Sequence, residues 1–190
     1  MIIFDLDGTL ADCGHRLHFV ENPYSIDGES PDCNCSEPNR EFSCPFDDWS
    51  AWRPDWKAFY EACDKDKPIS PTCELYSHYF CAGHEIEIWS GRCESTRNKT
   101  IDWILENVLT WIYPKEYEQP IEDIILKMRP IGDNTPDYQL KERWLDEALA
   151  EGKTIDFVFD DRPKVVRMWR RRGIFVFNCS QQGQEFYEEN

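Results

Sequence analysis

Two aspartates near the start of the chain carry the clearest chemical signal in the sequence. Asp5 and Asp7 follow an apolar run that begins at Ile2, and Gly8 comes directly after them. Alternation along a strand would turn both carboxyl groups to the same face. Burying two carboxylates this close costs free energy unless a cation lies between them or one of them holds a proton. The pair therefore indicates a divalent metal site, an acid/base role, or both.

Other polar residues fall where other predicted strands end. Ser90 follows an alternating segment at 85–89, and Asp160-Asp161 follows a strongly apolar segment at 155–159. Ligands of open α/β sheets bind beyond the carboxyl ends of the strands. We therefore expect these side chains to meet Asp5 at a common site.

The elements that must hold these residues alternate between strand and helix. Apolar or alternating segments predict strands at 2–6, 85–89, 124–128, 155–159 and 174–177. Helical spacing, N-terminal prolines and terminal glycines predict helices at 70–82, 94–108, 135–152 and 163–172. Such βαβ units with right-handed crossovers form a parallel sheet with helices on both faces. The predicted fold class is therefore α/β, as a three-layer sandwich.

The stretch 11–67 interrupts this alternation. It holds much of the proline, glycine and cysteine, together with the cluster Trp49, Trp52 and Trp56. It is too long for a structureless connection inside a compact domain. We interpret it as a cap inserted after the first strand, so that 1–10 and 68–190 form the core. The cap tryptophans either pack within the cap or stack on a nucleobase.

Four motifs, in this order, resemble those of the haloacid dehalogenase (HAD) phosphatase superfamily: Asp5-x-Asp7-Gly8-Thr9, Ser90-Gly91-Arg92, Lys141 and Asp160-Asp161-Arg162. Segment 157–173, in which Asp-Asp-Arg precedes Val-Val-x-Met-Trp-Arg, is similar to the last motif of the phosphatase domain of bacteriophage polynucleotide kinase/phosphatase. The segments 12–18 and 56–68 are similar to stand-alone phage proteins of that group, whereas the cysteine-rich stretch 32–44 departs from them. The sequence contains no GxxxxGK[ST] phosphate loop of the kinase half. The resemblance implies a Rossmann-like HAD sheet with a small inserted cap.

The resemblance also implies catalytic roles. Asp5 would attack phosphorus and form an aspartyl-phosphate. Asp7 would protonate the leaving oxygen and later activate water, a role that calls for a raised pKa. Ser90 and the Gly91 amide would bind phosphoryl oxygens, and Lys141 would neutralise the charge that develops in the transition state.

One Mg2+ is the implied cofactor. Asp5, the Asp7 carbonyl and Asp161 would hold it, with Asp160 as support or as the alternative ligand. The metal would offset repulsion between the phosphate and the Asp5 carboxylate. Arg92 and Arg162 are candidates for additional phosphate contacts, because a guanidinium binds such oxygens bidentately.

Several of these residues have a plainer interpretation. Ser90-Gly91 is also compatible with a simple turn. Lys141 lies on a helix face rich in charges, and Lys127 or Arg143 would replace it if it were solvated. The basic run at 167–172 is either a nucleic-acid patch or, as is more usual, a solvated helix end favoured by the helix dipole. His15 and Arg16 are candidates to face the active site from the base of the cap.

The cysteines offer a second metal hypothesis. Cys33-x-Cys35 and Cys44, with Cys13 or Cys63 and with His15 or His18 as further candidates, would supply ligands for a structural Zn2+ in the cap. The spacing is not a standard C-x2-C pair, which favours free thiols instead.

Charge and length limit the function classes. A formal net charge of −16 opposes non-specific binding to long nucleic acids and to anionic membranes. No basic segment precedes the first apolar run, and no stretch reaches the length of a transmembrane helix. We therefore expect a cytoplasmic protein that does not bind a membrane. The sequence also gives no sign of an obligate protein partner. The expected function is Mg2+-dependent hydrolysis of phosphate monoesters. The first candidate substrate is a polynucleotide 3′-phosphate and the second is a free nucleotide. A catalytically silent binding module is the last alternative.

Overall fold

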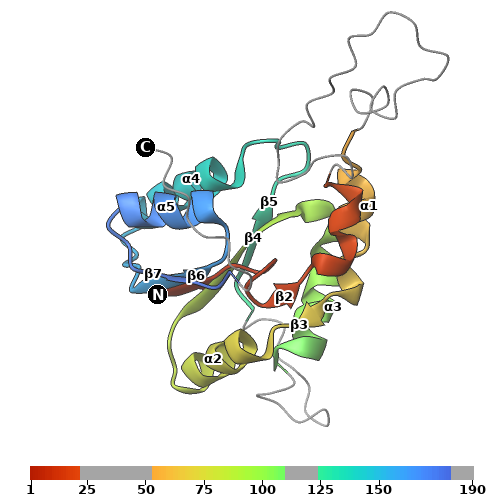
Figure 1. Cartoon of the computed structure of the whole chain (residues 1–190). Helices are drawn as coiled ribbons and strands as arrows, with labels where there is room; N and C mark the ends of the chain where they lie inside the picture. The colour runs from red at the N-terminus through yellow and green to blue at the C-terminus, as the bar shows by residue number, and fades with distance from the viewer. Residues whose placement is uncertain (22–52, 110–123, 181–190) are drawn as a thin grey trace, which may run out of the picture.

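The computed structural model describes residues 1–21, 53–109 and 124–180 (Figure 1). Within them, a parallel five-stranded sheet has the order β5-β4-β1-β6-β7. Its strands are β1 (Ile2–Phe4), β4 (Ile86–Cys93), β5 (Leu126–Arg129), β6 (Phe157–Asp160) and β7 (Val176–Asn178). The predicted α/β class with a parallel sheet is confirmed.

Helices cover both faces of this sheet (Figure 1). On one face, α2 (Ser70–Cys81) and α3 (Arg97–Asn107) pack against side chains that include Ile2 and Phe4. On the other, α4 (Asp137–Ala150) and α5 (Pro163–Arg171) pack against Ile3. Alternation along β1 therefore divides the core into two apolar layers. Asp5 follows Phe4 and has the same parity as Ile3, which turns its side chain toward the α4 face.

One boundary differs from the prediction in a way that matters for the site. β4 was expected to end at Trp89, but it continues to Cys93, so that Ser90 lies within the strand rather than after it. The extension pairs with β5, where Ser90 lies opposite Met128 and Cys93 opposite Arg129. The register shifts between these two pairs, and such a bulge redirects the side chains of the strand that contains it.

The described parts of the predicted cap form a small unit beside the carboxyl end of β1. β2 (Ala11–Asp12) pairs antiparallel with β3 (Lys67–Pro68), so the two ends of the predicted insertion lie together. Between them lie the 3-10 helices η1 (Gly14–Phe19) and η3 (Cys63–Lys65) and the short helix α1 (Trp56–Glu61). The extent of the insertion, 11–67, stays a prediction.

The basic run of α5 pairs with its neighbour α4. Arg171 donates to Glu142 at 2.9 Å, and Arg172 donates to Asp146 at 2.6 Å. Met168 and Trp169, on the same helix, are buried. These ion pairs favour the interpretation of the run as a solvated helix end. Among the described residues, no helix has the length and apolar character needed to span a bilayer.

Candidate active site

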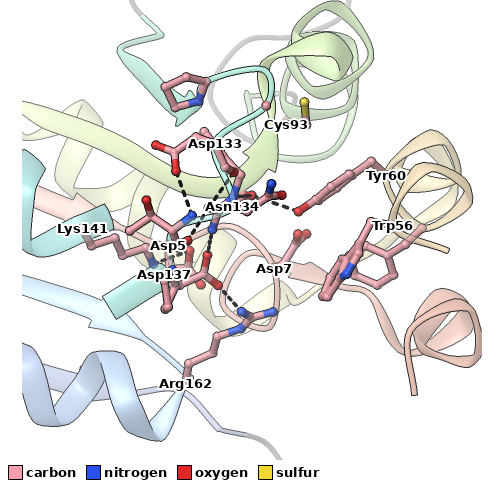
Figure 2. A pocket seen from close by; sticks show the side chains of 17 residues that line it. Asp5, Asp7, Trp56, Tyr60, Cys93, Asp133, Asn134, Asp137, Lys141 and Arg162 are labelled. Atoms are coloured by element: carbon pink, nitrogen blue, oxygen red, sulfur yellow. Dashed lines mark hydrogen bonds and ion pairs between the residues drawn. The ribbon is translucent and has the colours of Figure 1, made fainter. Parts of the chain in front are cut away.

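A cavity of about 360 Å³ opens at the carboxyl end of the sheet, between the core and α1. Figure 2 shows the carboxylates and basic side chains of the core on one side of it and the aromatic rings of Trp56 and Tyr60 on the other. The lining includes Asp5, Asp7 and Lys141. The residues that the sequence singled out at different strand ends therefore converge.

Asp5 lies at the base of this cavity against one lysine. The Lys141 ammonium group donates to Asp5 Oδ1 at 2.7 Å and to Asp160 Oδ2 at 2.8 Å, and all three side chains are buried. Burial raises the pKa of Asp5 well above its usual range, Lys141 opposes this, and the charges of Asp160 and Asp161 reinforce it. Burial lowers the pKa of Lys141, but the two carboxylates raise it more, so this lysine stays charged.

Asp160 and Asp161 have different surroundings. Asp160 accepts from Lys141, from the Trp169 indole at 3.4 Å and from the Arg162 amide at 3.2 Å. In contrast, Oδ1 of Asp161 is buried without a hydrogen-bond partner. Burial, followed by repulsion from Asp160, raises the pKa of Asp161 to about 6. Asp161 is therefore the carboxylate with an oxygen left to bind a ligand.

Carboxylate oxygens of Asp5, Asp160 and Asp161 lie within 4.8 Å of one another. Two buried aspartates and the half-buried Asp161, with one lysine and one carboxylate oxygen lacking a partner, make a hard anionic site of the kind that Mg2+ prefers. Gly8 permits this approach: its φ is +86°, and a Cβ there would lie 1.9 Å from Asp161 Oδ2. The residues present thus fit a divalent cation.

Asp7 faces two arginines. Its Oδ1 accepts from Arg16 at 2.7 Å and from Arg92 at 2.5 Å and 2.9 Å. Burial raises the pKa of Asp7, but Arg92 and then Arg16 lower it more, so the net direction is downward. The expectation of a raised pKa at Asp7 is wrong for this arrangement, because two buried guanidinium groups stabilise the ionised form.

Both arginines are also anchored to Asp66. Arg16 donates to both carboxylate oxygens of Asp66 at 2.7 Å, and Arg92 donates to Oδ2 at 2.5 Å. His15 contacts the same carboxyl group at 2.9 Å. Arg16 therefore reaches the active site, whereas His15 contacts it only through Asp66. Arg92 is fully buried within this network and does not line the cavity.

Ser90 and Gly91 lie next to a second group of charged residues, which is centred on Asp137. The buried Ser90 hydroxyl accepts from the Arg92 amide at 3.2 Å, and Gly91 lines the cavity. A Cβ on Gly91 would lie 2.7 Å from Asp137 Oδ1. Asp137 in turn binds Arg129 through Oδ1 and Arg162 through Oδ2 (Figure 2). The Arg162 side chain, which pairs with Asp137, is 48% exposed and lines the cavity.

Several residues at the site were not singled out from the sequence. Arg129 ends β5 and donates to the Gly91 carbonyl at 2.9 Å, so its place at a strand end was a usable signal. Asp137 precedes Lys141 by four residues and thus shares its helix face. Asp66 carried no comparable signal, because its partners come from distant parts of the chain.

The alternatives raised from the sequence are placed elsewhere. Lys127 pairs with Glu147 at 2.7 Å and Arg143 with Asp133 at 2.7 Å, so neither replaces Lys141 beside Asp5. Cys33, Cys35 and Cys44 lie outside the described residues. Cys13 and Cys63 are free thiols, and the candidate metal cluster found in the described part of the chain consists of carboxylates. The described residues thus lend no support to the zinc hypothesis.

Comparison with known proteins identifies a family that agrees with this site. The family model described as "Polynucleotide kinase PNKP phosphatase domain" matches residues 55–184. A protein of Autographa californica nuclear polyhedrosis virus, named as a bifunctional polynucleotide kinase/RNA ligase, is 34% identical over 107 residues, which are 56% of this chain and 14% of that protein. The chain thus spans a small part of this relative's length.

Solved structures agree on the fold. The Pnkp1/Rnl/Hen1 RNA repair complex contains a chain with a TM-score of 0.57 and 21% identity, covering 93% of this chain and 41% of that one. A family IA, variant 3 HAD hydrolase from Entamoeba histolytica has a TM-score of 0.51 and 15% identity, covering 95% of this chain and 85% of that one. At such identities the likeness establishes a shared HAD-like fold.

Proposed function

The chain belongs to the polynucleotide kinase PNKP phosphatase family, within the HAD phosphatases, and from this premise we propose that it removes a terminal 3′-phosphate from a polynucleotide. The observation that carries the chemistry is the buried Asp5 carboxylate, which faces the cavity and is held by Lys141. Its neighbours form a cation site on one side and an arginine-bound carboxyl group on the other.

In the first step, an oxygen of Asp5 attacks phosphorus as the bond between phosphorus and the leaving oxygen breaks. Asp7 transfers its proton to that oxygen, so the product leaves as an alcohol. In the second step, water attacks phosphorus and gives a proton to Asp7. The bond to Asp5 then breaks, which releases phosphate and regenerates both carboxyl groups.

Asp7 must hold a proton to act as the general acid, and binding of the substrate raises its pKa. Arg16 and Arg92 hold this carboxyl group ionised in the protein alone. A phosphate dianion entering the cavity adds negative charge beside Asp7, and a neighbouring like charge raises a carboxyl pKa. Asp7 therefore takes up its proton with the substrate, while its two arginines keep it oriented.

The remaining residues orient the phosphoryl group. Lys141 stays charged beside the oxygen that attacks, where it stabilises the charge of the transition state. Gly91 lines the cavity beside Asp137, and Arg162 supplies a partly exposed guanidinium at the same cavity. We assign Arg92 to orienting Asp7 rather than to contacting the phosphate.

Asp5 and Asp161 are the side chains that would hold Mg2+, together with the Asp7 carbonyl, while Asp160 supports Lys141. When bound, the ion supplies positive charge that offsets repulsion between phosphate and the carboxylates. The buried Asp161 oxygen without a partner supports this assignment.

Hydrolysis of free nucleotides is the second candidate. The net charge of −16 favours it, because a strongly acidic protein repels the extended phosphate backbone of a polynucleotide.

Substrate comparison separates the two candidates. Phosphate release is measured from a 3′-phosphorylated oligonucleotide, its 5′-phosphorylated counterpart, and the 3′- and 5′-mononucleotides, with Asp5→Asn as the background control. The proposal expects the highest kcat/KM with the 3′-phosphorylated oligonucleotide. A higher value with a mononucleotide would replace it by the second candidate, and metal-dependent release from none of the four would reject both.

A further inference from the structure

The wall of the cavity opposite Asp5 is aromatic. Trp56 and Tyr60, one turn apart on α1, face the cavity from this side (Figure 2). Their ring planes are within 29° of parallel, with centroids 6.0 Å apart. Trp56 is 46% exposed, so part of its indole surface is open to a ligand in a cavity that also holds charged groups.

This aromatic wall is held in place by the catalytic network itself. Asp55 caps α1 by accepting from the Ala58 amide at 2.9 Å. Phe59, on the same helix, lies beneath the Arg16 guanidinium at 4.1 Å, and its carbonyl accepts from Arg16 at 3.2 Å. Because Arg16 also binds Asp7, the position of α1 is tied to the carboxyl group that transfers the proton.

The two other rings of α1 fix the orientation of Trp56. Phe59 meets it edge to face, with centroids 5.7 Å apart and planes at 82°. The Tyr60 hydroxyl donates to the Gly91 carbonyl at 3.5 Å, which links the helix to the phosphate side of the cavity. An exposed indole held in one orientation is a preorganised stacking surface, so little rotamer entropy is lost when a flat ligand covers it.

We propose that Trp56 is a stacking platform for the nucleobase of the nucleotide whose phosphate lies at Asp5. This inference rests on the proposed function and adds a base subsite to it. A ligand that fills the cavity must present an anionic group to Lys141 and Arg162 and a flat π face to the indole, and a nucleotide combines both. Stacking accepts any base, so the site discriminates against phosphate esters without a base rather than among bases.

The test compares two substrates that differ only in the base. One is a 3′-phosphorylated oligonucleotide, and the other has an abasic sugar at its phosphorylated 3′ end. Trp56→Ala is expected to raise KM for the first by about 5- to 150-fold, with little change in kcat and no change on the abasic substrate. Trp56→Phe should restore most of the loss. Phe175→Ala, which removes an exposed ring outside the cavity, is the matched control and should change neither value.

Two outcomes overturn the stacking role. Equal losses on both substrates would make Trp56 a structural residue of α1, and unchanged KM on both would mean that the base does not contact it. Calorimetry with a 3′-phosphorylated mononucleotide separates this failure from that of the proposed function. Tight binding to the wild type that Trp56→Ala weakens, without any phosphate release, rejects the phosphatase proposal but keeps the stacking platform. Turnover with equal affinity in the two proteins rejects only the platform.

Discussion

The two aspartates that open the site are two residues apart in the chain but lie in opposite electrostatic surroundings. Asp5 shares one lysine with Asp160 and lies beside Asp161, so negative charge exceeds positive charge around it. Asp7 binds Arg16 and Arg92, and both arginines also bind Asp66. In this group, the two positive charges match the two negative charges. The pKa of Asp5 is raised and that of Asp7 is lowered.

The difference shows how one short motif provides two chemical roles. An excess of carboxylates leaves the Asp5 side in need of a cation, which suits a nucleophile that must meet a phosphate dianion. The Asp7 side already holds its positive charge in fixed guanidinium groups, which suits a carboxyl group that must stay oriented while its proton moves.

The largest expected effect is at the two carboxyl groups themselves. Asp5→Asn removes the nucleophile and should reduce phosphate release to background. Asp7→Asn should lower kcat by about 10²- to 10⁴-fold, the usual contribution of a general acid. Acid quenching of each variant with labelled substrate should recover no phosphoenzyme from the first and some from the second. Equal amounts of phosphoenzyme from both variants would contradict the assignment of Asp5 as nucleophile and Asp7 as general acid.

The next effect concerns the lysine of the Asp5 side. Lys141→Met leaves Asp5 and Asp160 buried without their shared cation, which should lower kcat by about 10²- to 10³-fold. The same change should reduce the free energy of unfolding by about 3–5 kcal/mol, measured by urea denaturation without metal.

Lys127→Met is the matched control for Lys141→Met, because its partner Glu147 is largely exposed. It should change kcat less than about twofold and stability by under about 1 kcal/mol. A larger catalytic loss in Lys127→Met than in Lys141→Met would contradict the assignment.

Gly8 offers a change directed at the metal side alone. Gly8→Ala forces a Cβ into the position of Asp161 Oδ2 and should weaken Mg2+ binding by about 10- to 100-fold, as lost metal-site positioning usually does. Gly83→Ala is the control: its φ is +80°, but nothing lies within 4 Å of the new Cβ. Each should lose about 1–2 kcal/mol of stability from the left-handed backbone, and Gly8→Ala should lose more because its Cβ overlaps Asp161. Metal titration of activity separates them, and equal Mg2+ affinity would contradict the placement of the ion.

The smallest effect is expected at the basic end of α5. Arg171→Ala breaks an exposed pair with Glu142 and should change stability by less than about 1 kcal/mol. The KM for a 3′-phosphorylated oligonucleotide should also stay the same. A severalfold increase in KM that depends on salt would instead support the interpretation of this run as a nucleic-acid patch.

Much of the fold could be predicted because its signals are local. The apolar run at the start of the chain, Pro71 at the start of α2 and Pro163 at the start of α5 marked elements within a few residues. The extension of β4 past Trp89 was missed, because Ser90-Gly91 is typical of a turn and only pairing with β5 keeps this segment extended.

The sequence by itself determined that Asp5, Asp7 and the Asp160-Asp161 pair belong to one site, because the carboxyl ends of parallel strands meet at one edge of a sheet. Lys141 was added to that site by the resemblance, with Lys127 and Arg143 as alternatives. Only the tertiary structure decided their partners. It placed Lys141 rather than Lys127 beside Asp5, left Asp161 with the unpaired oxygen, and turned Arg92 toward Asp7. The physical reason is that partner choice and the resulting pKa values depend on burial and on distances of a few ångströms between remote segments, which no local pattern encodes.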